Sequence, residues 1–511
     1  MKKNILINIS LSILSAILTF LAFPPFELSF LAWISLVPLL FVAKRCSPKE
    51  AVLYSYFSGV VFFSLLLYWL VNVTVPGLIV LVFLLSIVYG LFGGLSACVF
   101  KYSMTFFILP FSWALLEYIR GNLLTGFSWG LLSYSQYKAI KLIQIADFAG
   151  AYGVSFVIVV FNIALFSLII RDKRRVVYSI AAVAFIAMAV VYGTFKFKEY
   201  PVRANPKISV IQGNVPQEYK WDPAFSGSIV GTYSKLTEKA AAGKPDMIVW
   251  PETSYPYLVD TIDKAAEEVG ELALELKTPI LAGVVFKEGD DYYNSAFLFD
   301  KEGGVSGIYS KVHLVPFGEY IPWAEYLSFL RDHIDKPIGE FRAGEDYNLL
   351  TLRSQTRQMN FSDDTRTRQT VFYKFGVLIC FEDVFPYITR EFVRSGADFI
   401  VNITNDAWFG ETAAPVQHLQ ASVFRAVENR VPVIRVANTG ISCFVDSTGE
   451  VLSSVELEGK RIFVGGFATA SVNVYDGQTL YTAFGDIFIL ICFIMFIFLL
   501  IIEGYLPKSK Q

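Results

Sequence analysis

The sequence predicts a protein in two parts, a polytopic α-helical membrane domain of about eight spans and an extracytoplasmic α/β domain. Three observations lead to this prediction. Hydrophobic residues make up 54% of the 511 positions and charged residues only 17%, whereas about a quarter of the residues in a soluble protein are charged. Seven apolar stretches of membrane length precede a polar block, and one more follows it. Within the block, short β-rich runs alternate with amphipathic stretches.

The apolar stretches predict a membrane domain over residues 1–200 and a C-terminal transmembrane helix over 483–502. Each stretch is close to the ~20 residues that a helix needs to cross a ~30 Å hydrocarbon core, although the second is short. The first lacks a small-residue cleavage site, so we expect a retained helix and not a removed signal peptide. The expected spans are residues 5–23, 28–43, 51–73, 77–100, 103–119, 152–170, 176–192 and 483–502.

The distribution of Lys and Arg between the connections predicts the orientation, because basic residues are retained on the cytoplasmic side. With the N-terminus inside, the inner connections and termini carry twelve Lys and Arg residues and the outer connections carry three. Both termini are therefore expected in the cytoplasm. After seven crossings, the polar block is expected on the other side of the membrane.

The polar block, residues 205–477, is predicted to fold as one α/β domain. Its strand-like runs include "KISVIQGN", "DMIVWPET", "KFGVLICFED" and "ADFIVNITND". Polar residues collect just past the ends of these runs, which is where α/β sheets place their chemistry. Residues 353–369 are polar and lack periodicity, so we expect a mobile surface loop there and not a site.

Composition argues against several classes of partner and cofactor. The formal charge is −2 and the isoelectric point is near 6.1, so the basic excess of a nucleic-acid-binding protein is missing and no nucleic-acid partner is expected. The five cysteines lie far apart, without the spacing of a disulfide framework or a zinc site. Three histidines without clustered ligands make a metal site unexpected, and no cofactor is predicted.

Cys380 is the candidate nucleophile. It ends the apolar run "GVLIC", and Glu382 and Asp383 follow it almost directly. A free cysteine is often a buried small hydrophobe, and that alternative stays open. However, other strand-like runs also end in polar patches, one with Glu252 and one in "TNDAWFG" with Asn405. A reactive thiolate needs a nearby base, and these strand ends offer carboxylates.

Glu252, Lys311 and two histidines are further candidates for the same site. Glu252 follows "MIVW" and is a candidate base, although it could also be the first-turn acid of a following helix. Lys311 lies among apolar neighbours, where a lysine is costly unless it is paired; the alternative is a solvated lysine at an edge. His313 and His418 leave a Cys-His dyad open. The residues alone therefore predict a membrane-anchored α/β domain with a candidate thiol nucleophile.

Three motifs carry a resemblance to a known family. Glu252 in "WPET", Lys311 in "YSKVHLVPFGEYIP" and Cys380 in "LICFED" are 59 and then 69 residues apart. In this order they resemble the Glu-Lys-Cys triad of the nitrilase, or carbon-nitrogen hydrolase, superfamily. With its membrane spans and the segments "GFSWGLLSYSQY", "QGNVPQEYKW", "TNDAWFG" and "RVANTGIS", the whole chain resembles the apolipoprotein N-acyltransferase family. Two departures are Phe381, where relatives often have Tyr, and a longer segment at residues 353–369.

The resemblance implies an α-β-β-α sandwich and an enzyme at the bacterial inner membrane, with its catalytic domain in the periplasm. It would transfer an acyl chain from a phospholipid to the α-amino group of the S-diacylglyceryl-cysteine of an apolipoprotein, the last step of lipoprotein maturation. Cys380 would carry the acyl group as a thioester in a ping-pong reaction. Glu252 would move the proton, and Lys311 would stabilise the thiolate and the oxyanion.

The resemblance also implies supporting roles. Glu319 and Glu382 would support the centre. Trp221, Phe381 and Trp408 would contact substrate, although the two tryptophans could instead be interfacial anchors. Two other functions stay open at this point. One is a membrane-tethered nitrilase-type amidase, and the other is a non-enzymatic membrane scaffold in which the cysteine is structural.

Overall fold

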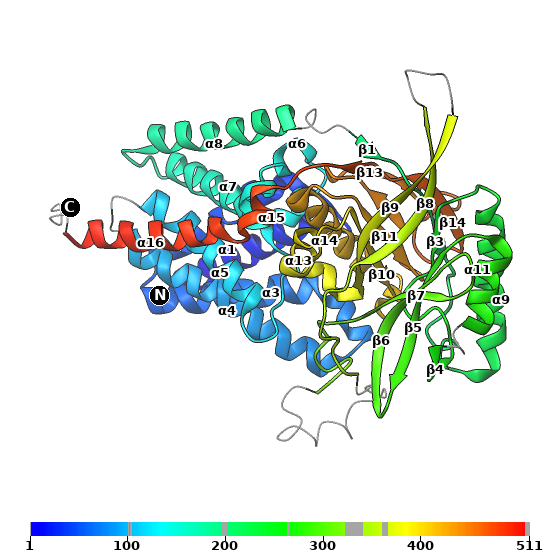
Figure 1. The fold of residues 1–511 in the computed structure, drawn as a ribbon. Coiled ribbons are helices and arrows are strands. Elements are labelled where there is room, and N and C mark those ends of the chain that lie inside the picture. The colour runs from blue at the N-terminus through cyan, green and yellow to red at the C-terminus, as the bar shows by residue number, and fades with distance from the viewer. Residues whose placement is uncertain are drawn as a thin grey trace. The chain divides into compact units, whose positions relative to one another are not determined.

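The computed structural model describes residues 2–100, 102, 105–196, 202–262, 266–321, 341–359 and 366–505 (Figure 1). The chain forms two compact units. The first unit comprises Met1–Glu199, Val416–Phe424 and Thr479–Gln511, and the second comprises Tyr200–Pro415 and Arg425–Gln478. The stretch Val416–Phe424 lies within the predicted catalytic block by sequence, yet its contacts place it in the first unit.

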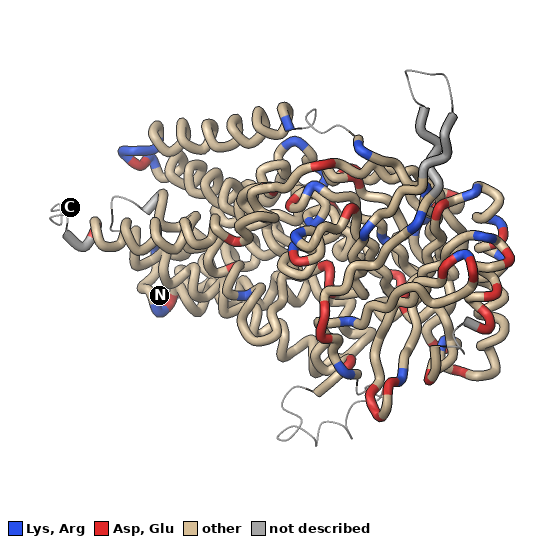
Figure 2. The backbone as a smooth tube through the Cα atoms, in the orientation of Figure 1, with Lys and Arg blue, Asp and Glu red and all other residues tan. Residues whose placement is uncertain are grey.

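Long apolar helices build the first unit, and few charged residues lie along them (Figure 2). Among the described residues, four helices are long and apolar enough to cross a membrane, namely α1, α4, α7 and α8. These helices are compatible with a membrane domain, whereas the total of about eight spans stays a prediction. The longer helices are α1 (Lys2–Leu21), α3 (Pro48–Leu66), α4 (Val75–Val99), α5 (Thr105–Asn122), α7 (Ala146–Ile169), α8 (Arg175–Lys196) and α16 (Ile487–Tyr505), and the short ones are α6 (Ile140–Ile143) and α15 (Leu480–Phe484).

The second predicted span is broken, so the expectation of one continuous helix at residues 28–43 was wrong. A 3-10 helix, η1 (Ser29–Trp33), precedes α2 (Val37–Arg45), whose nine residues rise only about 14 Å. Asn162 of α7 binds both sides of the break: its Nδ2 donates to the Ala32 carbonyl at 3.0 Å, and its Oδ1 accepts from the Leu36 amide at 2.9 Å. This distant side chain satisfies backbone groups that a helix would have paired internally.

The buried side chain of Gln417 helps to hold the stretch Val416–Phe424 in the first unit. Its Oε1 accepts hydrogen bonds from the indole nitrogens of Trp69 at 3.1 Å and Trp129 at 2.9 Å. Its Nε2 donates to the carbonyls of Pro24 at 3.3 Å and Leu66 at 3.2 Å. Both lone pairs and both N–H groups of the amide are thus used, as a buried amide requires.

Two β-sheets form the second unit. One contains, in spatial order, β14 (Gly466–Ser471), β2 (Lys207–Gln212), β3 (Met247–Val249), β5 (Ile280–Glu288), β6 (Asp291–Phe299) and β7 (Val305–Ser310), with β4 (Leu258–Val259) paired to β5. The other contains β13 (Val451–Ser454), β12 (Cys443–Val445), β11 (Val433–Ala437), β10 (Phe399–Thr404), β9 (Arg366–Ile379) and β8 (Leu350–Met359). A small ribbon pairs β1 (Val202–Ala204) with β15 (Val474–Tyr475).

Helices cover the sheets of the second unit in an α-β-β-α arrangement (Figure 1). Helices α9 (Ser226–Ala241) and α11 (Glu271–Leu276) lie over the sheet that contains β2, and α13 (Pro386–Arg394) lies over β9. The two sheets contact each other through β2 with β11 and through β6 with β9. Helix α14 (Ala414–Asn429) begins and ends in this unit. The predicted α/β domain is confirmed.

Parallel pairing places several strand ends at common edges. Strand β10 runs parallel to β9 and β11, and β3 runs parallel to β2 and β5. All six residues of β10 are buried, as expected of a strand covered on both faces. Because parallel strands end at the same edge of a sheet, the polar residues after β9 and β10 are neighbours.

Residues 353–359 and 366–369 lie in two paired strands, so the expectation of a loop was wrong for the described residues of the 353–369 segment. Strands β8 and β9 pair antiparallel from Leu350 with Phe375 to Met359 with Arg366. Residues 360–365 lie outside the described residues. Because an antiparallel ladder is made by backbone N–H and C=O groups, a segment without hydrophobic alternation can still form one.

Candidate active site

The three residues predicted as a triad lie in the loops after three strands of the second unit. Cys380 follows β9 directly and begins the short 3-10 helix η7 (Cys380–Val384). Glu252 lies three residues beyond β3, and Lys311 follows β7 directly. Lys311 is 1% exposed, so the alternative of a solvated edge lysine was wrong.

Cys380 is held in a strained backbone conformation. Its φ of 56° is uncommon for a residue other than glycine and persists only where the surrounding structure enforces it. Burial raises the pKa of the Cys380 thiol well above its ordinary value, Glu252 raises it further and Lys311 opposes both. The resting thiol therefore carries its proton, and its reaction requires a base. The residue as a whole is only partly buried.

A chain of hydrogen bonds joins Lys311 to Glu252 through two other side chains. The Lys311 ammonium donates to Glu319 Oε1 at 2.9 Å. Asn294 of β6 donates through its single Nδ2 to Glu319 Oε1 at 3.0 Å and to Glu252 Oε1 at 2.8 Å. Burial is the largest single influence on the pKa of Lys311 and would lower it. The Glu319 carboxylate and the other acidic groups nearby together outweigh burial, so the pKa is raised and Lys311 stays charged.

Glu382, which was expected to support the site, connects the loop that begins at Cys380 to the loop that carries Lys311 through hydrogen bonds. The side chain is fully buried, and its burial raises its pKa to about 7 while Lys311 opposes the shift. Donors from both loops surround the carboxylate, and this gives it a positioning role. They are the backbone N–H groups of Ile379 at 2.7 Å, Val312 at 2.8 Å and His313 at 3.0 Å, and the Tyr309 hydroxyl at 3.0 Å.

The backbone around Glu252 is fixed from two sides. Gly283 of β5 faces it so closely that an added Cβ would lie 2.5 Å from the Pro251 oxygen and 2.7 Å from the Glu252 Cα. From another side, the Nζ of Lys220, a residue 3% exposed, donates to the Glu252 carbonyl at 2.8 Å. Burial lowers the pKa of Lys220 to about 8, while Glu252 and Cys380 oppose the shift.

A buried ion-pair cluster supports the loops after β9 and β10. Arg435 of β11 contacts Asp383 through Nη1 at 3.1 Å and Asp406 through Nη2 at 3.0 Å, and all three side chains are fully buried. Gly440 packs against this cluster, where a Cβ would lie 2.0 Å from Asp406 Oδ2. The guanidinium fork thus joins the nucleophile loop to the neighbouring strand end.

The remaining predicted residues lie less centrally. The ring of Phe381 packs edge-on against that of Phe385, with 5.0 Å between centroids. Trp408 is partly buried in the 3-10 helix η8 (Asp406–Phe409), and Trp221 is 54% exposed. Contact of these residues with substrate stays a prediction. In the described part of the chain, no group of three or more His, Cys, Asp and Glu side chains could hold a metal ion.

The two histidines that were candidates for a dyad with Cys380 make other contacts. The ring of His313 packs on that of Phe385 at 3.8 Å between centroids, and its Nδ1 lies 2.9 Å from the Tyr387 hydroxyl. His418 belongs to the first unit, where it packs on Trp129. The groups that shift the thiol pKa include the carboxylate and the lysine predicted from the motifs. The geometry therefore favours the Glu-Lys-Cys alternative over a Cys-His dyad.

Sequence reasoning missed Asn294, Tyr309 and Lys220. Asn294 lies in "YYNSAF", where an amide inside a strand of otherwise buried residues was a usable signal. Lys220 stands beside Trp221 in a motif that was noted only for its resemblance. Its burial depends on the fold, because a lysine in a turn is exposed in most proteins.

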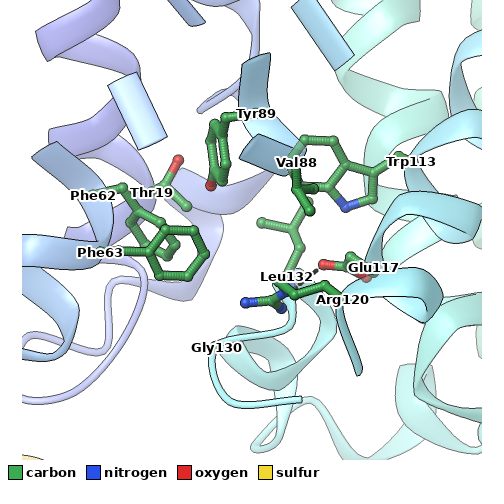
Figure 3. A pocket seen from close by; sticks show the side chains of 10 residues that line it. All are labelled: Thr19, Phe62, Phe63, Val88, Tyr89, Trp113, Glu117, Arg120, Gly130 and Leu132. Carbon is green, nitrogen blue, oxygen red and sulfur yellow. Dashed lines mark hydrogen bonds between the residues drawn. The ribbon is translucent and has the colours of Figure 1, made fainter. Parts of the chain in front are cut away.

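The first unit contains a separate small cavity of about 10 Å³, enough for about one water molecule (Figure 3). Glu117 and Arg120 of α5 both line it. Glu117 Oε1 accepts from the Leu132 amide at 2.8 Å, and Arg120 Nη1 donates to the Trp129 carbonyl at 2.9 Å. These buried charges hold the backbone near Gly130, whose φ is 66°.

Comparisons with known proteins identify the family. A family model described as "Apolipoprotein N-acyltransferase N-terminal domain" matches residues 15–164, and one described as "Carbon-nitrogen hydrolase" matches residues 207–473. The apolipoprotein N-acyltransferase of Geobacter metallireducens is 37% identical over 507 residues, with 94% of this chain and 92% of that protein covered. The chain belongs to the apolipoprotein N-acyltransferase family.

Other relatives extend the match across both units. The family member of Pasteurella multocida is 30% identical, with 95% of this chain and 93% of that protein covered. Among solved structures, a nitrilase-superfamily amidase of Nesterenkonia AN1 is 18% identical and aligns with 54% of this chain and 93% of its own, at a TM-score of 0.38. That score is too low to add to the assignment. Membership of this family, predicted from the motifs, is confirmed.

Proposed function

We propose that this protein transfers an acyl chain from a membrane phospholipid to the α-amino group of the S-diacylglyceryl-cysteine of an apolipoprotein. The observation that carries the proposal is the coupling of the Cys380 thiol to Glu252 and Lys311 in one buried set of side chains. The names of the relatives, and the apolar helices of the first unit, support lipid-anchored substrates. Lipid substrates leave a bilayer at a cost of about 0.8 kcal/mol per buried CH₂, so their enzyme must work at the membrane.

In the first half-reaction, Glu252 takes the proton of the Cys380 thiol as sulfur attacks the ester carbonyl of the phospholipid. The ammonium of Lys311 stabilises the oxyanion of the tetrahedral intermediate, and it stays charged because Glu319 raises its pKa. The ester C–O bond then breaks, and the leaving alkoxide takes the proton from Glu252. The products are a thioester on Cys380 and a lysophospholipid.

In the second half-reaction, the α-amine of the apolipoprotein attacks the thioester carbonyl. Glu252 accepts one amine proton, and Lys311 again faces the oxyanion. The C–S bond breaks, the amide forms, and the sulfur of Cys380 regains its proton from Glu252. The amine can attack only after the lysophospholipid has left its position beside the thioester carbonyl, so the kinetics should be ping-pong.

For its orientation, we propose cytoplasmic termini and a periplasmic second unit, with the protein in the bacterial inner membrane. The excess of Lys and Arg in the connections on one side supports this arrangement. It requires η1 and α2 to serve together as one crossing. Their rise is about 24 Å without the three residues between them, which suits a broken span inside a helix bundle.

Two experiments test these proposals. The purified protein should convert a synthetic diacyl lipopeptide, in bilayers of one defined phospholipid, to a product heavier by one acyl chain of that phospholipid. Release of free fatty acid without that product would indicate a hydrolase. If neither acylated lipopeptide nor free fatty acid formed, the scaffold alternative would remain. For the orientation, a tag within residues 353–369 should react with a membrane-impermeant reagent from the periplasmic side, and one at 171–175 should not. The reverse labelling would contradict the topology.

A further inference from the structure

Lys220 is a buried cation that the mechanism above does not use. Its side chain is 3% exposed, and its Nζ donates to a neutral partner, the Glu252 carbonyl, at 2.8 Å. By contrast, the ammonium of Lys311 forms a direct ion pair with Glu319. A buried ammonium that lacks a directly paired carboxylate is unfavourable for folding, so its presence calls for another reason.

The surroundings of Lys220 supply such a reason. The groups whose charge acts on it are Glu252 and Cys380, the base and the nucleophile of the proposed reaction. Proton transfer from Cys380 to Glu252 moves a negative charge onto sulfur, and a nearby positive charge stabilises that thiolate. The hydrogen bond to the Glu252 carbonyl also fixes the peptide that carries the base.

We propose that Lys220 is a positioning residue for acylation: it fixes the Glu252 peptide and supplies a second positive charge beside Cys380 while the thiolate forms. The proposal rests on the proposed function, because it concerns the same thiol. Lys311 faces the centre from the loop after β7, and Lys220 faces it from the segment after β2. Positive charges from two loops thus act electrostatically on the Cys380 thiol.

The acylation rate should depend on the charge of Lys220. Because burial lowers the pKa of Lys220 to about 8, the positive charge is present below that pH and lost above it. The rate of acylation should therefore fall as the pH rises through 8. Other charged or titratable groups couple to the same thiol, namely Glu252, Lys311 and Asp406, with Glu319 and Glu382 beside Lys311. Of these, Glu382 has a pKa of about 7, so its titration lies a unit lower and should persist in every Lys220 variant.

The test measures acylation alone, without a lipopeptide, because the α-amine itself titrates near pH 8. Full-length protein is mixed with a defined diacyl phospholipid between pH 6.5 and 9.5, and the acyl adduct on Cys380 is followed by intact mass. Three variants separate the two roles. Lys220→Met removes both the hydrogen bond to the Glu252 carbonyl and the positive charge, Lys220→Gln keeps an N–H group that can donate to this carbonyl, and Lys220→Arg keeps the charge. Lys207→Met is the matched control, because Lys207 Nζ also donates to a backbone carbonyl, that of Gly243, at 2.7 Å.

We expect Lys220→Met and Lys220→Gln to acylate Cys380 at least about tenfold more slowly at pH 7, which is the effect of about one pKa unit on the thiol. In both variants the decrease of the acylation rate near pH 8 should disappear. Lys220→Arg should be faster than both and keep its rate to higher pH, while Lys207→Met should match wild type throughout. The proposal would be overturned if Lys220→Gln acylated at the wild-type rate and its rate fell above pH 8 as in wild type. It would also be overturned if a folded Lys220→Arg were as slow as Lys220→Met. No adduct on Cys380 in the wild type would instead refute the proposed function.

Discussion

Replacing Lys311 by Met separates the electrostatic role of this lysine in folding from its role in the reaction. The ammonium lies 2.9 Å from Glu319 Oε1, and both side chains are largely removed from solvent, at 1% and 12% exposure. At an effective dielectric constant of 20 this separation corresponds to a Coulomb attraction of about 6 kcal/mol. Desolvation offsets much of that attraction, but removing one partner leaves the other charge buried and costs about 3–5 kcal/mol.

The variant Lys311→Met should therefore melt at a temperature at least about 6 °C lower, since about 1 kcal/mol shifts the melting temperature of a domain of this size by 2–4 °C. Acylation of Cys380 should fall by at least about 10²- to 10³-fold, the cost of losing one oxyanion donor. Adding Glu319→Gln removes the unpaired charge, so the double variant should regain at least half of the lost melting temperature. Its acylation should stay slow, because the ammonium is still missing.

Both quantities can be measured on one preparation in detergent micelles, with melting followed by tryptophan fluorescence at a fixed scan rate, since unfolding of such a protein is irreversible. Acylation is followed by intact mass with phospholipid alone. Near-normal acylation in Lys311→Met would refute the assigned role of this lysine. Recovery of acylation together with stability in the double variant would show that the single substitution acts only through misfolding.

Further substitutions test the other residues of the site. Cys380→Ala should form no acyl adduct, and Glu252→Gln should form it at least about 10²-fold more slowly because the thiol loses its base; an adduct on another cysteine would contradict the mechanism. Gly283→Ala should abolish acylation, because its Cβ would lie 2.5 Å from the peptide before Glu252, whereas Gly231→Ala in α9, with no atom within 4 Å of its Cβ, should stay fully active. Burial raises the pKa of Glu382 to about 7, so the folded protein binds this proton more tightly than the unfolded chain between about pH 4.3 and 7. The melting temperature of wild type should accordingly fall relative to that of Glu382→Gln as the pH rises through this window, and a constant difference would contradict the assigned pKa.

The candidate nucleophile was predictable because its signal is local. Cys380 ends an apolar run and is followed by acidic residues, a pattern that places a side chain at the end of a buried strand. Glu252 carries the same signal after β3. The sequence around Lys311 did not show whether this lysine is solvated or buried and paired. The fold decided this by placing Glu319 against it. Only the motif order, through the family resemblance, selected the buried alternative in advance.

The contacts of the supporting residues could not be predicted because their partners are distant in sequence. Glu382 accepts hydrogen bonds from amides 69 and 70 residues earlier, and Lys220 donates to a carbonyl 32 residues later. The break between η1 and α2 likewise depends on Asn162, which lies 126 residues beyond Leu36. In each case a buried polar group requires a partner, and the sequence does not say which one the fold will bring near.

The sequence by itself determined the membrane character, the α/β class of the polar block and the order of the reactive residues, because composition, strand patterning and motif spacing are local properties of the chain. Only the tertiary structure decided that residues 353–359 and 366–369 lie in paired strands and that Val416–Phe424 packs in the first unit. It also decided that Lys220 is buried against the peptide of Glu252. These features arise from long-range hydrogen bonds and burial, whose free energy exists only once distant segments have come together.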